Sequence, residues 1–88
     1  MTSVTVQVKH ELGLHLRAAA RLATLTATAT GPVRLTANAV TVDGKSLLGI
    51  TSLLAGPGTM LTIEIATDAD QSVLQQIVDL IENDFDHP

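Results

Sequence analysis

The sequence predicts a small α+β domain in which four antiparallel strands form a sheet and three helices cover one of its faces. Two observations predict this fold class. Apolar residues alternate with polar ones over four short segments, as in half-buried strands, and recur every three or four residues over three others, as in amphipathic helices. The segments follow one another as βαββαβα, and two helical crossovers interleaved with a hairpin favour an antiparallel sheet with its helices on one face.

The first strand is predicted over residues 3–9, where three valines alternate with polar residues. The first helix is predicted over residues 16–28, because apolar residues follow the spacing of one helical face: Ala18, Leu22, Leu25 and Ala29. A Gly-Pro pair at residues 31–32 then breaks the chain.

A hairpin and a short helix are predicted next. The strands of the hairpin lie around residues 33–37 and 40–42, with a turn at Asn38. The helix begins near Ser46 and ends at the Gly-Pro-Gly sequence of residues 56–58. That glycine-rich sequence follows a helix and precedes a strand, the reverse of the order in phosphate-binding loops, so we expect a turn there.

The last part of the chain is predicted to form the fourth strand and the final helix. Leu61, Ile63 and Ile65 alternate with polar residues, as in a strand. Asp68 and Gln71 have the spacing of a capping box at the start of the helix. The inward stripe of this helix is continuous and apolar: Val73, Leu74, Ile77, Leu80 and Ile81.

Composition narrows the classes of function. The 88 residues are expected to form one domain over residues 1–88, and the absence of cysteine excludes a disulfide framework and a thiolate metal site. Phe85 is the only aromatic residue and the net charge is −4, which argues against nucleic acid as a partner. The sequence has no signal pattern and no apolar run long enough for membrane insertion, so a cytoplasmic location is expected.

Charge is distributed unevenly along the chain. Residues 1–45 contain all five lysines and arginines and have a balance of +3, whereas residues 46–88 contain no base and have a balance of −7. This asymmetry suggests a basic face for an acidic partner or an anion. Ordinary solvated surface is the alternative, and it is favoured for the acidic half.

The most informative segment is Gly13-Leu14-His15-Leu16-Arg17-Ala18-Ala19, which follows a strand and opens a helix. His15 is therefore expected at or next to the helix N-cap, where unpaired N–H groups and the helix dipole favour an anion. A phosphate carried on the ring would be stabilised there, and Arg17 would add a charge-assisted hydrogen bond. On local chemistry alone, a merely polar histidine and a surface arginine explain these residues equally well.

These residues carry a resemblance to the HPr family, the histidine-containing phosphocarriers of the bacterial phosphoenolpyruvate:sugar phosphotransferase system. The resemblance covers essentially the whole chain. It rests on the βαββαβα order, on the G-L-H-x-R-x-A-A pattern of residues 13–20 and on Lys45-Ser46-Leu47-Leu48-Gly49 before the second helix.

The resemblance implies an HPr-like open-faced sandwich and a phosphoryl carrier that is not an independent enzyme and needs no cofactor. His15 would be phosphorylated on its δ nitrogen by enzyme I and would pass the phosphoryl group to a sugar-specific enzyme IIA. Arg17 would stabilise the phosphate. Family members usually have alanine at the position of Leu16 and proline at that of Ala18, so the first turn here has an additional N–H donor.

Ser46 is predicted to be the N-cap of the second helix. In many HPr proteins the matching serine is also phosphorylated by a dedicated kinase, which slows enzyme I and creates a form that binds regulators. The resemblance thus raises an HPr kinase/phosphorylase and a transcriptional regulator as further partners. The surface that meets partners is predicted to include Leu16, Ala20, Arg21, Thr24, Leu47, Leu48, Thr51 and Ser52.

Two alternatives to the sugar-branch carrier stay open. The first is a carrier of the nitrogen-related branch, because the chain has Phe85-Asp86 near its end and lacks lysines that many relatives carry near positions 24, 27 and 49. The second is a noncatalytic docking module of the same fold. His10 and His87 are interpreted as surface histidines, and no metal site is predicted.

Overall fold

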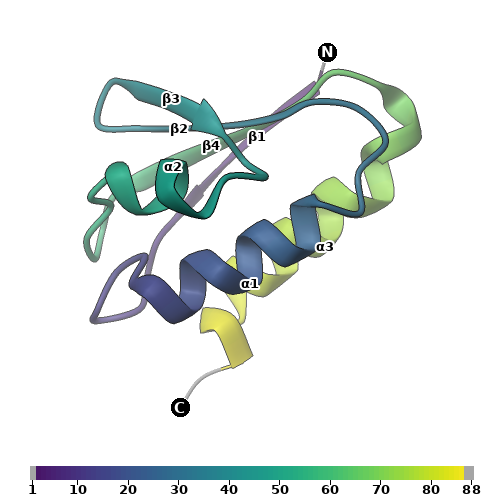
Figure 1. Ribbon diagram of the computed structural model, residues 1–88. Coiled ribbons are helices and arrows are strands. Elements are labelled where there is room, and N and C mark those ends of the chain that lie inside the picture. The colour runs from purple at the N-terminus through teal and green to yellow at the C-terminus, as the bar shows by residue number, and fades with distance from the viewer. Residues whose placement is uncertain (1, 87–88) are drawn as a thin grey trace.

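The computed structural model describes residues 2–86 and confirms the predicted element order (Figure 1). Two short 3₁₀ turns, η1 and η2, accompany α3. The elements are β1 (Thr2–Gln7), α1 (Leu16–Thr26), β2 (Val33–Ala37), β3 (Val40–Asp43), α2 (Leu47–Ser52), β4 (Met60–Ile65), η1 (Asp68–Asp70), α3 (Gln71–Glu82) and η2 (Asp84–Asp86).

The four strands form one antiparallel sheet in the order β1-β4-β2-β3. Ile63 of the central strand β4 lies opposite Val4 on one side and Leu35 on the other, so apolar side chains form a row across the inner face. The three helices lie on this inner face, and α1 and α3 run side by side (Figure 1). The fold class predicted from the sequence is therefore confirmed.

The outer face of the sheet carries polar side chains. Arg34 on β2 forms an ion pair with Glu64 on β4 at 3.6 Å. Hydroxyl pairs join neighbouring strands at Thr5–Thr62 (2.9 Å) and Thr36–Thr41 (2.8 Å). This alternation of apolar and polar residues is what a sheet with one solvated face requires.

The core between sheet and helices contains the apolar stripes that the sequence predicts. On α1, Ala18 and Leu22 are fully buried, Ala29 beyond its end is buried, and Leu25 is partly buried. All five predicted residues of α3 are buried. The largest fully buried apolar side chains are Leu22, Leu35, Ile50, Leu53, Leu61, Ile63, Ile65, Ile77 and Ile81.

Both α1 and α2 are shorter than predicted. α1 ends at Thr26, because the N–H groups of Thr28 and Ala29 bond to carbonyls three residues back instead of four, at 3.1 and 3.0 Å. α2 ends at Ser52 rather than near residue 56, because Leu54 adopts a left-handed conformation with φ of 53°. The first strand ends at Gln7.

The predicted capping box at Asp68 and Gln71 is wrong. Thr67 caps η1 by accepting the Ala69 N–H at 3.3 Å, and α3 begins after that turn. The buried carboxylate at the start of α3 belongs to Asp70, which is 1% exposed and makes no side-chain capping bond to its own helix. It accepts the N–H groups of Thr30 (2.8 Å) and Gly31 (2.9 Å) and so ties the α1–β2 loop to the start of α3.

The Thr30 and Gly31 backbone N–H groups hold the pKa of Asp70 below its ordinary value of 3.8. Its carboxylate is thus kept ionised by donors from another part of the chain. Within residues 2–86, none of the helices has the length and apolar character needed to cross a bilayer.

Candidate functional site

His15 is the N-cap of α1, as the sequence predicts. Its backbone is extended (φ −66°, ψ 172°), its carbonyl accepts the first helical bond from Ala19 N–H at 2.9 Å, and its side chain is half-buried. The ring nitrogen Nδ1 accepts the Ala18 N–H at 3.3 Å. The imidazole therefore occupies the position that a capping side chain takes at the end of a helix.

The hydrogen bond from Ala18 distinguishes the two nitrogens of the ring. Because Nδ1 accepts an N–H, the proton of the neutral ring is assigned to Nε2. The lone pair of Nδ1 points at the positive end of α1, where the first amides have no intrahelical carbonyl partner. An anion attached to Nδ1 would meet these donors directly.

The turn before His15 depends on Gly13, which has a φ of +63°. A Cβ at this position would lie 2.4 Å from the carbonyl oxygen of Ala55, so no other residue fits without moving the backbone. The next residue, Leu14, is buried and donates its N–H to the same carbonyl at 2.8 Å. These two motif residues anchor the start of α1 against the loop that follows α2.

His10 is not a surface histidine, and that prediction is wrong. It is 7% exposed, and its ring lies against the ring of His15, with 4.8 Å between the centroids and 58° between the planes. The signal was present in the sequence, because His10 continues the inward alternation of Val6 and Val8 beyond the end of β1. His87, the other histidine interpreted as a surface residue, lies outside the described residues.

A cleft of about 450 Å³ opens beside His15. Its lining comes from the turn before α1, from α1 itself and from η2: His10, Leu12, His15, Arg17, Ala18, Arg21, Asp84 and Phe85. Arg21 donates to the carbonyl of Phe85 at 2.7 Å and so ties η2 to α1. Asp84 has one buried carboxylate oxygen without a hydrogen-bond partner among the described residues.

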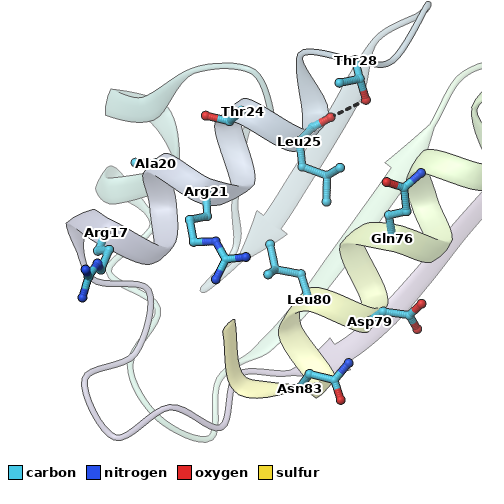
Figure 2. A pocket seen from close by; sticks show the side chains of 10 residues that line it. All are labelled: Arg17, Ala20, Arg21, Thr24, Leu25, Thr28, Gln76, Asp79, Leu80 and Asn83. Atoms are coloured by element: carbon cyan, nitrogen blue, oxygen red, sulfur yellow. Dashed lines mark hydrogen bonds between the residues drawn. The ribbon is translucent and has the colours of Figure 1, made fainter. Parts of the chain in front are cut away.

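Arg17 is exposed at the edge of this cleft, two residues beyond His15. A second groove of about 690 Å³ continues from Arg17 along the surface between α1 and α3. Figure 2 shows Leu25 and Leu80 pointing toward each other inside that groove, with Arg17 at the opposite end of α1. The guanidinium has no hydrogen bond or ion pair in the described part of the chain that would hold it away from His15.

Ser46 is the N-cap of α2, again as predicted. Its hydroxyl oxygen accepts the Gly49 N–H at 3.0 Å. Lys45, beside it, donates from Nζ to the carbonyl of Ala29 at 3.2 Å. Lys45 and Arg34 line one surface depression, whereas Arg17 and Arg21 line the cleft beside His15.

The residues predicted to meet partners all lie on α1 and α2, which pack against each other. All three leucines are exposed, Leu16 to 66%, Leu48 to 82% and Leu47 to 37%. The remaining five are exposed or half-buried: Ala20, Arg21, Thr24, Thr51 and Ser52. Sequence reasoning did not include Leu12 and Leu54, which are also largely exposed and lie in the loops beside α1 and α2.

Fold and site together define a class of protein: a small open-faced α+β domain that presents one helix-capping imidazole and a neighbouring arginine as a place for an anionic group. Comparison with known proteins agrees. Residues 2–83 match the family model described as the PTS HPr component phosphorylation site. The chain therefore belongs to the HPr family of phosphocarriers of the phosphotransferase system.

Individual relatives are similar over nearly their whole length. The phosphocarrier protein HPr of Cupriavidus necator is 36% identical over 86% of this chain and 85% of its own, and that of Pseudomonas aeruginosa is 34% identical over 98% and 97%. Among solved structures, HPr-C-His from Thermoanaerobacter tengcongensis has a TM-score of 0.93 with 28% identity, covering 100% of this chain and 99% of that one.

Proposed function

We propose that His15 accepts a phosphoryl group from phospho-enzyme I and passes it to a sugar-specific enzyme IIA. One observation carries this proposal. The unprotonated Nδ1 of a half-buried imidazole lies at the N-terminus of α1, 3.3 Å from the Ala18 amide. The site thus combines a nucleophile with donors for the charge that the nucleophile would receive.

The transfer needs no proton to move. The lone pair of Nδ1 attacks phosphorus, an N–P bond forms, and the bond between phosphorus and its donor atom on enzyme I breaks with its electron pair returning to enzyme I. The proton on Nε2 stays in place. The Ala18 N–H, released from Nδ1, is then in position to donate to a phosphate oxygen. Transfer to enzyme IIA runs through the same steps in reverse.

Arg17 supplies charge to the transferring group in this proposal. Its exposed guanidinium lies at the edge of the cleft beside His15 and can turn toward a phosphate on Nδ1. A guanidinium forms short, charge-assisted bonds with phosphate oxygens. We assign the protein the role of a carrier and not of an independent enzyme, because it contributes a nucleophile and an anion site while its partners contribute the rest of the chemistry.

The docking surface for enzyme I and enzyme IIA is proposed to surround His15 on α1 and α2. Leu16, Leu47 and Leu48 would serve as its apolar contacts, since all three expose apolar area beside the site. The rim of this surface would consist of the polar residues Arg21, Thr24, Thr51 and Ser52, together with the small residue Ala20. The nitrogen-branch alternative uses the same surface and is distinguished by which enzyme IIA accepts the phosphoryl group.

Ser46 is proposed as a regulatory position on the same surface. A phosphate on its hydroxyl would place about two negative charges at the start of α2, which packs against α1. Those charges would repel an acidic partner as it approaches His15. An HPr kinase/phosphorylase and a transcriptional regulator are the partners that this regulation would require.

Incubation with phosphoenolpyruvate, magnesium and enzyme I tests the carrier function. We expect one phosphate per chain by intact mass spectrometry, and we expect acid to remove it, because N–P bonds hydrolyse in acid whereas phosphoserine survives. His15→Ala should accept no phosphate, and Ser46→Ala should accept it normally. Acid-labile label on His15→Ala would refute the assignment.

A further inference from the structure

We infer that His10 is a positioning residue for the reactive imidazole: its buried ring holds the plane of the His15 ring so that Nδ1 stays directed at the start of α1. This inference rests on the proposed function, since a position of the His15 ring matters for transfer only if that ring carries the phosphoryl group. The observations that carry it are the burial of His10 and its ring contact with His15.

The first step of the argument is that an imidazole at this position is unexpected. Val6 and Val8 occupy the two preceding inward positions, and a third aliphatic residue would continue the core at no polar cost. Burying an imidazole requires hydrogen-bond partners. The turn provides one, because the Leu12 N–H donates to Nδ1 of His10 at 3.1 Å.

The second step is that this hydrogen bond fixes the His10 ring. Its Nδ1 is an acceptor, and its own backbone carbonyl accepts the Gly13 N–H at 2.8 Å, so both ends of the residue are held by the same turn. The ring is thus a rigid surface and not a mobile neighbour. Its separation and tilt relative to His15 fall in the range of tilted aromatic pairs.

The third step is that His15 needs a second restraint. The Ala18 N–H lies 3.3 Å from Nδ1, which is longer than most N–H hydrogen bonds, and this single contact leaves rotation of the ring weakly restrained. The His10 ring limits that rotation from the other side. A nucleophile held in a reactive orientation transfers faster than one that must find it, and small misplacements cost about tenfold or more.

Two variants separate ring packing from closure of the turn. His10→Asn keeps an acceptor for the Leu12 N–H but removes the ring, whereas His10→Phe keeps a ring against His15 but removes the acceptor. We would measure kcat and KM of enzyme I with each variant as the phosphoryl acceptor. Glu11→Ala, an exposed change in the same turn, is the matched control.

We expect His10→Asn to lower kcat about tenfold with KM unchanged within about twofold, because His10 is buried and acts through the orientation of the His15 ring. His10→Phe should keep kcat within about twofold of the unmodified protein. Three outcomes would overturn the inference: a lower kcat for His10→Phe than for His10→Asn, equal kcat values for all variants, or a change confined to KM. If His10→Phe does not fold, the kcat and KM of His10→Asn still decide.

Nuclear magnetic resonance of the ring nitrogens gives a readout without enzyme I. In the unmodified protein, His15 should show one tautomer, with Nε2 protonated and Nδ1 not. In His10→Asn the two tautomers should mix, and a spectrum identical to that of the unmodified protein would overturn the inference. If enzyme I phosphorylates neither protein, the proposed function fails, while this spectrum still reports whether His10 fixes the ring.

Discussion

Two neighbouring helices of this protein begin in the same way and carry different chemistry. His15 caps α1 by accepting the Ala18 N–H at 3.3 Å, and Ser46 caps α2 by accepting the Gly49 N–H at 3.0 Å. In the proposed mechanism, the imidazole forms an N–P bond that a partner readily breaks, whereas the hydroxyl would form a lasting ester. In this proposal, the amides at each helix start would stabilise a phosphate, and the capping residue would decide how long the phosphate stays.

Exchanging the reactive cap for an inert one should produce the largest effect. His15→Asn keeps a side-chain oxygen that can accept the Ala18 N–H, so the free energy of unfolding should change by no more than about 1 kcal/mol. Phosphoryl transfer from enzyme I should fall by at least about a thousandfold, because the nucleophile is gone. Urea unfolding and mass spectrometry measure the two effects. Acid-labile phosphate on His15→Asn would show that the imidazole of His15 is not the group that accepts it.

Removing the arginine beside the reactive cap should slow transfer about a hundredfold without affecting the fold. Arg17→Ala takes away positive charge where the phosphate would form in the proposed mechanism, and Arg17 is exposed, so little packing is lost. Arg34→Ala is the matched control, because Arg34 is also exposed but pairs with Glu64 on the outer face of the sheet. The variants are compared by the rate of phosphoryl transfer from enzyme I, measured by stopped-flow kinetics. Equal rates would show that Arg17 is only a surface residue.

Negative charge at Ser46, the cap of α2, should slow phosphorylation of His15, the cap of α1. Ser46→Asp should lower phosphorylation of His15 by enzyme I about tenfold, while its stability stays equal or rises slightly, since aspartate is a good N-cap. Ser46→Ala should transfer normally but lose about 1 kcal/mol of stability with the cap. If the two variants transfer at the same rate, charge at α2 does not reach the site on α1.

Removing the Ala18 amide that donates to His15 should have a smaller effect, on both the acceptance of the phosphoryl group and the hydrolysis of phosphohistidine. Ala18→Pro removes the N–H, and its position in the first turn of α1 tolerates proline. Acceptance of the phosphoryl group should become about two- to fivefold slower, because the His15 ring loses its hydrogen-bond restraint and the incoming phosphate loses a donor. Phosphohistidine should hydrolyse faster, because the phosphate lacks that donor. Unchanged rates of both steps would contradict this account.

Neutralising Asp70 at the start of α3 should lower the stability of the protein and leave phosphoryl transfer unchanged. The pKa of Asp70 lies below 3.8 because Thr30 and Gly31 donate to it, so its ionised form stabilises the folded protein above about pH 4. That stabilisation is lost as the pH falls through the folded pKa. Asp70→Asn should be less stable than the unmodified protein at pH 7, and the difference should narrow on acidification. A constant difference from pH 7 to pH 2 would contradict it.

Local sequence predicted the features that depend on local rules. The caps at His15 and Ser46 follow from residue type and from the position of each residue before an apolar period, and both are confirmed. The capping box at Asp68 failed because Asp70 bonds to Thr30 and Gly31, whose positions lie 40 and 39 residues away. No pattern within one helix contains that information.

His10 shows a different reason for failure. The alternation of β1 does continue to it, but residue type argued for the surface, and the hydrogen bond from Leu12 that makes burial tolerable exists only once the turn has formed. The early end of α2 has a similar origin. The loop after α2 must bring the Ala55 carbonyl to the Leu14 N–H, and that contact links segments that sequence analysis treats separately.

The pairing of β1 with β4 also has a consequence for how the chain folds. Thr5 and Thr62 meet across a separation of 57 residues, so docking of β1 closes a loop that contains most of the protein. Closing so long a loop loses conformational entropy before favourable contacts can offset the loss. The β2–β3 hairpin, in contrast, joins residues only a few positions apart. The strand that leads toward His15 is therefore expected to pair late, and we expect the candidate site to form only when the sheet is complete.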